Sequence, residues 1–283
     1  MQGNSEEWDC IIRPQNKWHD LHLKEIWKHK DLLFLFVKRD LSSAYKQTIL
    51  GPLWFFIQPL ITTITFTIIF GKLAQLSTDG MPSFIFYLSG ITTWTYFAEC
   101  LTKTSNTFVI NQQIFGKVYF PRLIMPLSIV ITNMAKLGIQ LLLFLSFWIY
   151  FYITTDKLHP NTCILLLPVL IIIMAGLGLG FGMIISSLTT KYRDLTFLVG
   201  FGVQLLMYAS PIIMPMSSIH GKLYLLFKLN PMTSIINTFK YAFLGVGEFD
   251  ILGLIYSAGF ALFVIFIGIA VFNRVEKTFI DTV

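Results

Sequence analysis

Six long apolar blocks, separated by short polar stretches, constrain the fold of this 283-residue chain more than any other feature. A helix needs about 20 apolar residues to cross the hydrocarbon core of a bilayer, and each block reaches or nearly reaches that length. The sequence therefore predicts six membrane spans. The blocks are Leu53–Phe70, Ser83–Cys100, Ile124–Ile153, Cys163–Leu188, Leu195–Met214 and Ile251–Phe272.

The composition also indicates a lipid environment. Mean hydropathy is +0.69, and 55% of the residues are hydrophobic while 13% are charged. A soluble domain carries about a quarter charged residues. A transmembrane β-barrel alternates apolar and polar residues in strands of about 10, and these blocks do not alternate. We therefore predict an all-α membrane protein. Its first block follows 52 polar and basic residues, unlike a signal peptide, so that block should remain in the membrane.

The distribution of lysine and arginine predicts the orientation. With residues 1–52 in the cytosol, the inside segments hold 15 Lys or Arg and the outside segments hold five. Lys136 is left out of this count because it lies within the third block. Both termini are then cytoplasmic. The net charge of +6 reflects this asymmetry and an attraction to anionic headgroups. Because the chain lacks a clustered basic face with a recognition motif, we expect no nucleic-acid partner.

The chain divides into a short N-terminal extension and a membrane domain. Residues 1–30 are a polar extension with no assigned role, and residues 31–283 are expected to form one six-span transmembrane domain. A helix is predicted from about residue 21 to residue 46, with basic side chains and one apolar face made of Leu33, Val37, Leu41 and Ala44. Basic amphipathic helices beside a membrane usually lie in its interface. We therefore expect an N-terminal interface helix, ended by Gly51-Pro52.

The longest polar stretch between spans on the cytosolic side is Thr102–Arg122. Within it, Ser105–Phe115 is mildly amphipathic and too polar to cross a membrane. Lys136 lies about two turns into the third block. A lysine in a span is a functional hypothesis by default. Because this block is longer than a bilayer needs, Lys136 could equally reach the cytosolic headgroups with its flexible stem.

The external segment Met214–Asp250 contains two short apolar pieces, Leu223–Leu229 and Ile235–Val246, separated by Asn230-Pro231. Both pieces are too short to span, which favours re-entrant or interfacial helices. Irregular backbone at membrane depth is tolerated only against protein or a water-filled cavity. These half-inserted elements are therefore suited to a gate at the outer mouth.

The fourth block carries two pairs of glycines at the spacing of a GxxxG motif. The pairs are Gly176 with Gly180, and Gly178 with Gly182. Small residues at this spacing let two helices approach closely. The spacing favours packing within the chain and is only a weak indication of a dimer.

Recognisable catalytic motifs are absent from the sequence. The three Gly-Lys pairs lack the earlier glycine and the following Ser or Thr of a P-loop, and no HExxH or GxSxG motif occurs. The three cysteines form no CxxC pair, and His19 with His22 has no further ligand set, so neither a disulfide nor a metal site is expected. Coupled carriers generally keep buried carboxylates, which are almost absent from these spans. If the chain transports, its energy comes from a partner.

Several ordered sequence runs resemble permeases of ABC-type polysaccharide exporters, which move lipid-linked O-antigen or, in related members, teichoic acid. The strongest are YKQTILGPLWFFIQP, before and into the first span, and IFGKVYFPRLIMPL, before the third. Shorter matches follow in the family's order over the rest of the chain. They are KYRDL (Lys191–Leu195), SPIIMP (Ser210–Pro215), LNPM (Leu229–Met232) and RVEKTFID (Arg274–Asp281).

The resemblance implies a homodimer of six-span permeases in the bacterial inner membrane, resting on two copies of an ATPase subunit. ATP and Mg²⁺ would then belong to the partner, and this chain would hold no cofactor and be no enzyme. The resemblance also implies two functional segments. Residues expected to couple ATP-driven closure to the spans are Ser105, Phe108, Ile110, Gln112 and Phe115, and residues expected in the external gate are Leu226, Pro231, Ile235 and Phe239.

Aromatic residues gather in the first two spans, where not all can lie at one membrane interface. A polysaccharide offers hydroxyls and apolar CH faces, so a conduit for it should present flat aromatic faces that bind weakly enough to permit sliding. Packing and interfacial anchoring would equally explain the same aromatic side chains. The candidate conduit residues are Trp54, Tyr87, Trp94, Tyr96 and Phe97.

Two alternative functions remain open. A permease of similar architecture could export a drug or a lipid. A membrane-embedded enzyme acting on lipid-linked sugars would need catalytic carboxylates or histidines near the interface. The carboxylates near the outer interface form no recognisable constellation in the sequence: Asp79, Asp156, Glu248 and Asp250. Our preferred prediction is a permease that exports an undecaprenyl-linked polysaccharide of the O-antigen type.

Overall fold

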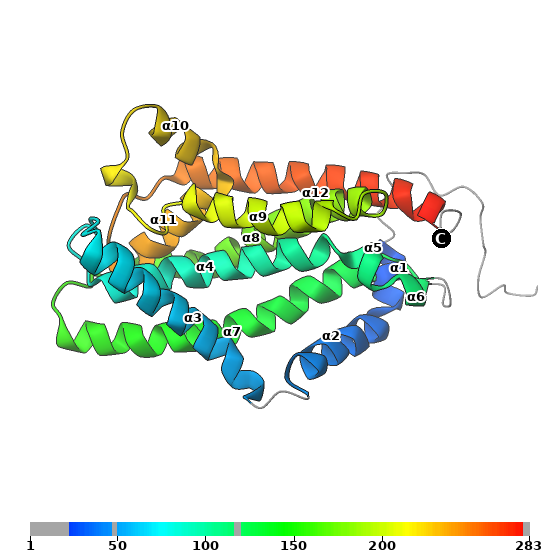
Figure 1. The fold of residues 1–283 in the computed structure, drawn as a ribbon, viewed down its shortest axis with the longest axis horizontal. Coiled ribbons are helices and arrows are strands. Elements are labelled where there is room, and N and C mark those ends of the chain that lie inside the picture. Colours follow the sequence, from blue (N-terminus) through cyan, green and yellow to red (C-terminus); the bar gives the residue numbers. More distant parts are fainter. Residues whose placement is uncertain (1–22, 47–49, 116–119, 280–283) are drawn as a thin grey trace, which may run out of the picture.

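The computed structural model describes residues 23–46, 50–115 and 120–279, and every regular element in these ranges is helical (Figure 1). Short 3₁₀ or π segments, labelled η, extend or join the α-helices. In chain order the elements are α1 (Leu23–Lys28), α2 (Lys30–Tyr45), η1 (Gly51–Leu53), α3 (Trp54–Phe66), η2 (Thr67–Leu73), α4 (Ser83–Thr104), α5 (Thr107–Ile110), α6 (Gln112–Phe115), α7 (Ile124–Thr154), η3 (Thr162–Leu166), α8 (Leu167–Thr189), α9 (Leu195–Tyr208), η4 (Met216–Ser218), α10 (Lys222–Leu229), α11 (Pro231–Leu244) and α12 (Ile251–Phe279).

Four helical runs in the described chain are long and apolar enough to cross a membrane: Gly51–Leu73, Ile124–Thr154, Thr162–Thr189 and Ile251–Val275. They correspond to the first, third, fourth and sixth predicted blocks. The second block forms α4, which has 22 residues but carries many hydroxyl side chains together with Glu99 and Lys103. The fifth block forms only the 14-residue α9. This helix ends before Ser210-Pro211, where the proline has no N–H and disfavours helical backbone at the preceding residue.

A proline and four threonines shape the first span. Pro59 lies inside α3, and the Thr63 hydroxyl donates to the Pro59 carbonyl at 2.7 Å. Thr62 and Thr67 likewise donate to the carbonyls four residues earlier, at 3.0 and 2.7 Å. Three threonine hydroxyls of this span therefore bond back to the preceding turn of the helix and need no partner in lipid. The π segment η2 follows and ends the run at Leu73.

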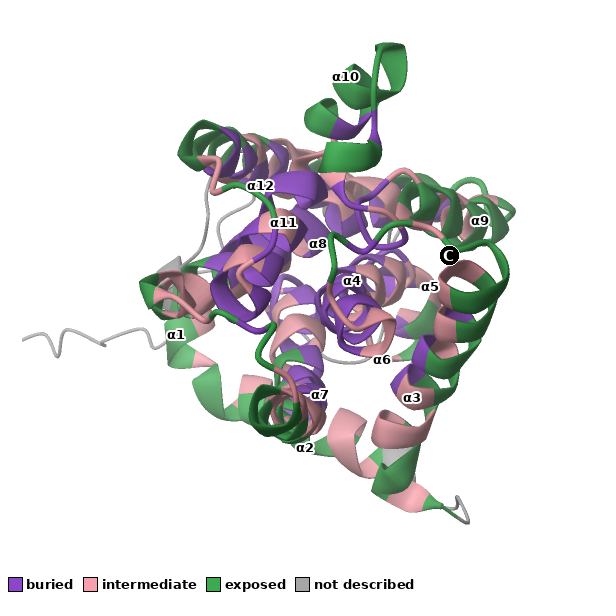
Figure 2. Ribbon diagram, turned by 90° about the vertical axis from the view of Figure 1, so that its left-hand side faces the viewer, coloured by how far each residue is buried: buried purple, intermediate pink, exposed green. Residues whose placement is uncertain are grey.

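The glycines of α8 bring two other helices into direct contact with it. A Cβ added at Gly178 would lie 2.6 Å from the Cβ of Cys100 on α4, and one at Gly182 would meet Thr104. A Cβ added at Gly180 would lie 2.7 Å from the backbone nitrogen of Ile265 on α12. Both GxxxG faces are thus occupied within one chain, which confirms the packing interpretation over the dimer interpretation. Figure 2 shows α4, α8 and α11 buried at the centre of the molecule.

Segments predicted on opposite sides of the membrane lie at opposite ends of the bundle (Figure 1). The η2–α4 connection and the turn before α10 meet at one end, where the Ser217 hydroxyl donates to Asp79 Oδ1 at 2.8 Å. Helices α5 and α6 lie at the other end. This arrangement agrees with the distribution of lysine and arginine. It also identifies exposed positions at both ends for testing the orientation.

We expect cysteines introduced at Ser77 and Ser218 to react with a membrane-impermeant maleimide in intact cells, and a cysteine at Gln113 to react only after permeabilisation. All three side chains are exposed, so the side of the membrane on which each residue lies, and not its burial, decides whether it reacts. The measurement uses a chain in which the three native cysteines are replaced by alanine. If the cysteine at Gln113 reacts in sealed cells, the predicted orientation is wrong and the protein lies in the membrane the other way round.

Candidate functional site

The segment predicted to couple to an ATPase folds as two short helices, α5 and α6, at the end of the bundle predicted to be cytosolic. Phe108 is buried and stacks on Phe272 of α12 with ring centroids 4.4 Å apart. The carbonyl of Ser105 accepts a hydrogen bond from the Thr189 hydroxyl of α8 at 3.0 Å. Phe115 is buried against Phe120, 5.8 Å between centroids. These contacts fix the segment to α8, α12 and the start of α7.

Two of the five predicted coupling residues reach the surface. Ile110 is 72% exposed at the end of α5, and Gln112 at the start of α6 is half-buried. The other three are buried and anchor the segment. The structure therefore divides the predicted set into three buried residues, one half-buried glutamine and one exposed apolar side chain that is free to contact a partner.

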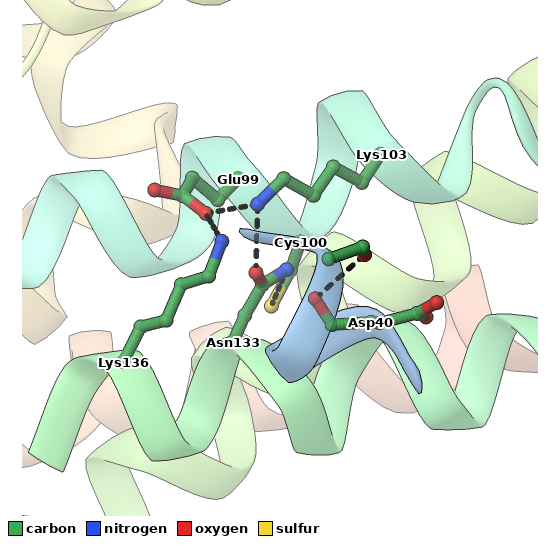
Figure 3. A network of polar contacts seen from close by, with 7 residues as sticks. Asp40, Glu99, Cys100, Lys103, Asn133 and Lys136 are labelled. Atoms are coloured by element: carbon green, nitrogen blue, oxygen red, sulfur yellow. Dashed lines mark hydrogen bonds and ion pairs between the residues drawn. The ribbon is translucent and has the colours of Figure 1, made fainter. Parts of the chain in front are cut away.

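A charged network connects α4 and α7 beside this segment (Figure 3). Glu99 Oε2 accepts from the ammonium of Lys103, one turn along α4, and from Lys136 Nζ of α7 at 3.1 Å. Lys103 Nζ also donates to Asn133 Oδ1 at 3.1 Å. We call Glu99, Lys103, Asn133 and Lys136 the cytosolic charged network. One carboxylate oxygen thus holds two ammonium groups from two helices.

This network contradicts the alternative in which Lys136 reaches the headgroups, while a functional role for this lysine stays a prediction. Its side chain is 10% exposed and paired with Glu99, and its ammonium lies 5.2 Å from the centroid of the Phe55 ring. A lysine that snorkelled would end among headgroups and water. Pairing within the bundle is the arrangement expected of an ionisable residue with a functional role. Sequence analysis missed the partner because Glu99 and Lys136 are 37 positions apart.

Two cavities adjoin the network. The first has a volume of about 280 Å³ and lies among α2, α4, α5 and α7, with Arg39, Lys103 and Lys136 in its lining. The second, of about 310 Å³, lies between α3 and α4 and is lined by Gln58, Trp94, Thr95, Ala98, Glu99, Thr102 and Lys103. Lys103 lines both. The network therefore lies between two cavities in the half of the bundle predicted to be cytosolic.

The candidate conduit residues divide into three groups. Tyr87, Tyr96 and Phe97 are buried within the core of the single chain. Trp94 is also largely buried but lines the second cavity together with hydroxyl side chains. Trp54 is exposed at the start of α3. Packing accounts for the first group, whereas the position of Trp94 is compatible with contact to a sugar; the conduit role stays a prediction.

The predicted external pieces form α10 and α11, joined at Asn230. The Asn230 side chain caps α11 by accepting from the Met232 N–H at 3.0 Å, and donates to the Ala209 carbonyl at 3.1 Å. Ile235 is fully buried, and the rings of Phe239 and Phe144 lie 5.2 Å apart. Pro231 is the first residue of α11. Helix α11 is therefore fixed in the core.

Helix α10 differs from α11 in its exposure. Leu226 and most of its neighbours on α10 are exposed, and Figure 2 shows this helix projecting from the bundle. Only Phe227 is buried among its residues. Of the four predicted gate residues, Leu226 alone lies on the surface. A movable gate at this end would thus involve α10, with α11 as its fixed support.

Lys240 anchors α11 to the end of α9, a role that the sequence did not reveal. Its ammonium donates to the carbonyls of Pro211 and Ile212 at 2.7 and 3.3 Å and lies 3.3 Å from the Phe86 ring centroid. In the charge count this lysine belonged to the external segment. It is instead buried, and it binds carbonyls of the turn that follows α9. Helical spacing within α11 could only have placed it on the apolar face.

Three of the four outer carboxylates line one cavity of about 440 Å³: Asp79, Glu248 and Asp250. Two of them have structural partners. Asp79 accepts from Ser217, and Asp250 Oδ1 accepts from the Gly253 N–H at 2.9 Å at the start of α12. The structure therefore places three carboxylates around one cavity, which the sequence did not indicate. Two of them, Asp79 and Asp250, also have structural roles as hydrogen-bond acceptors.

A chain whose described elements are all helical, with four membrane-length apolar helices and a largely buried lysine paired across two helices, is an integral membrane protein. A family model described as ABC-2 type transporter matches residues 31–244. The chain therefore belongs to the ABC-2 type transporter membrane family. The match includes the interface helix, the cytosolic charged network and α11.

Named relatives share most of the length of the chain. The O-antigen export system permease protein RfbA of Klebsiella pneumoniae is 28% identical over 253 residues, which is 89% of this chain and 94% of that protein. RfbA of Myxococcus xanthus is 25% identical over 223 residues, covering 78% and 83% of the two chains. The polysialic acid transport protein KpsM of Escherichia coli is 23% identical over 260 residues, covering 89% and 95%.

Proposed function

We propose that this chain is the transmembrane subunit of an ATP-driven exporter that moves an undecaprenyl-linked polysaccharide across the bacterial cytoplasmic membrane. The observation that carries the proposal is the nearly full-length similarity to O-antigen export permeases within the ABC-2 family. The KpsM relatives are named for the transport of polysialic acid, which is also an extended glycan. The cargo named for both groups of relatives is therefore a polysaccharide.

The energy source in this proposal is a separate ATPase with ATP and Mg²⁺. The chain lacks a P-loop, and the ABC-2 family implies such a partner. Ile110 supplies an exposed apolar contact for it at the cytosolic end. We place the ATPase against α5 and α6, one copy on each of two permeases.

The membrane arrangement proposed here has six spans, α3, α4, α7, α8, α9 and α12, within the domain 31–283. Residues 1–22 of the N-terminal extension lie outside the described ranges. Helix α4 is polar for a span, but the hydroxyls of Ser89, Thr92 and Thr93 are buried and bond to the preceding turn of the helix. Helix α9 exposes large apolar side chains, with Phe197 83% exposed. Such a surface suits lipid or a second copy in a homodimer, and both termini are cytoplasmic in this arrangement.

Reconstitution tests the function directly. The purified chain and its ATPase, placed in proteoliposomes with an undecaprenyl diphosphate-linked glycan, should move the glycan into the lumen only when ATP and Mg²⁺ are present outside. Protection of the glycan from an added glycosidase measures the transfer. ATP-driven movement of phospholipid or a drug without the glycan would favour the alternative exporters, and cleavage of the lipid-linked sugar would favour an enzyme.

A further inference from the structure

The cavity beside the cytosolic charged network carries an excess of positive charge. Its lining contains Arg39, Lys103 and Lys136, and the carboxylates that face these cations are Asp40 and Glu99. Arg39 is already bound to Asp40 at 2.8 Å. The two lysines share one carboxylate oxygen. The network therefore keeps one uncompensated positive charge at the edge of a hollow, which favours an anion.

The lysines also keep donors to spare. An ammonium has three N–H donors. Within the described part of the chain, Lys136 uses one of them on Glu99, and Lys103 uses two, on Glu99 and Asn133. Three N–H groups thus remain for a ligand between α4 and α7. Phosphate oxygens are acceptors that lysine binds well as a point charge.

A third group at the same cavity lacks a partner. Thr132 lies one turn before Lys136 on the same face of α7, lines the cavity and is 5% exposed. Among the described residues its hydroxyl has no hydrogen-bond partner. A buried hydroxyl without a partner costs free energy that an acceptor ligand would recover. This hydroxyl is therefore a second, independent indication of an unsatisfied polar group beside the two lysines.

The second cavity extends the site with a different chemistry. It shares Lys103 with the first and presents the Trp94 ring beside the hydroxyls of Thr95 and Thr102. A phosphate held by Lys103 would place whatever is attached to it against this aromatic and hydroxyl surface. Sugars carry the matching apolar faces and hydroxyl groups. The two cavities together fit a sugar joined to a phosphate.

We propose, building on the function proposed above, that Lys103 and Lys136 bind the diphosphate of the lipid-linked glycan, with its first sugar against Trp94. Helix α2 forms one wall of the first cavity, which places the site at the cytosolic interface, where lipid phosphates lie. Thr107 and Ile110 of the coupling segment form another wall. A bound diphosphate therefore touches the segment proposed to contact the ATPase and stimulates ATP hydrolysis.

Native mass spectrometry of the detergent-solubilised full chain tests the site with undecaprenyl diphosphate, undecaprenol and phosphatidylglycerol as probes. The chain should retain undecaprenyl diphosphate in preference to undecaprenol and to phosphatidylglycerol. Lys136→Met should weaken this retention about tenfold or more, because a hydrogen bond to a charged group is lost. Lys136→Arg should restore most of it. Lys72→Met, an exposed lysine at the outer end, is the matched control and should bind like the unchanged chain.

Equal retention of undecaprenol or of phosphatidylglycerol would overturn the proposal, as would full retention of the diphosphate by Lys136→Met. If that variant fails to accumulate, Thr132→Val decides, since it keeps the shape and charge of the site. It should weaken retention about threefold or more, and unchanged retention would overturn the assignment. A chain that exports glycan in proteoliposomes without this binding preference refutes the site alone. A chain that binds the diphosphate and exports no glycan refutes the function alone.

Discussion

Replacing Gly180 with leucine should prevent the chain from accumulating in the membrane. A Cβ at this position would lie 2.7 Å from the Ile265 nitrogen and 2.8 Å from the Val264 carbonyl carbon of α12. Both are backbone atoms, so rotation of a side chain cannot relieve the overlap. The two helices would have to separate along their whole contact, and membrane helix pairs depend on such close packing. Quantitative immunoblotting of membrane fractions measures the loss.

Gly180→Ala provides a graded version of the same change. Overpacking a rigid contact costs about 1–3 kcal/mol, against which alanine recovers about 1 kcal/mol of helix propensity. We expect the midpoint of thermal unfolding in detergent to fall. Gly259 on α12 is the matched control, because a Cβ there would meet nothing within 4 Å. Gly259→Ala should leave the midpoint unchanged or raise it. A Gly180→Ala chain as stable as this control would contradict the packing described here.

The extent of the helices was largely predictable from the sequence. The third apolar block, Ile124–Ile153, matches α7, Ile124–Thr154, because a sustained apolar run has few alternatives to a helix in lipid. The fifth block was wrong in length. Hydropathy continues past Tyr208 to Met214, but Pro211 prevents the helix from continuing, and Lys240 binds carbonyls of the turn that follows. The turn that ends α9 is thus held by Lys240 of α11, a segment that is distant in the sequence.

The partners of polar and small residues were not predictable from spacing. The glycine pattern of α8 defines two faces, but it cannot tell whether each face meets a helix of the same chain or of another copy. Lys136 was equally ambiguous because its carboxylate, Glu99, lies on a different helix. Periodicity describes one helix at a time, whereas these contacts depend on how helices are placed together. For this reason the division of the predicted coupling segment into buried and exposed residues required the structure, and its coupling role stays a prediction.

Replacing Ile110 with aspartate should abolish glycan export and the stimulation of ATP hydrolysis while leaving the permease folded. Ile110 is 72% exposed at the cytosolic end, so a carboxylate there meets water in the isolated chain. In a complex with the proposed ATPase, the same carboxylate would be buried in an apolar contact, and burying an unpaired charge is strongly unfavourable. We expect a loss of at least about tenfold in both activities.

Two further variants separate coupling from folding. Phe108→Ala removes a fully buried ring from the anchor and should lower the free energy of unfolding by about 3–5 kcal/mol, unlike Ile110→Asp. Leu73→Asp places the same charge at a similarly exposed position, 76%, at the opposite end of the bundle. It should leave the stimulation of ATP hydrolysis intact. If Ile110→Asp exports glycan as fast as the unchanged chain, the ATPase does not bind through α5, and the force that opens the permease reaches it through another surface.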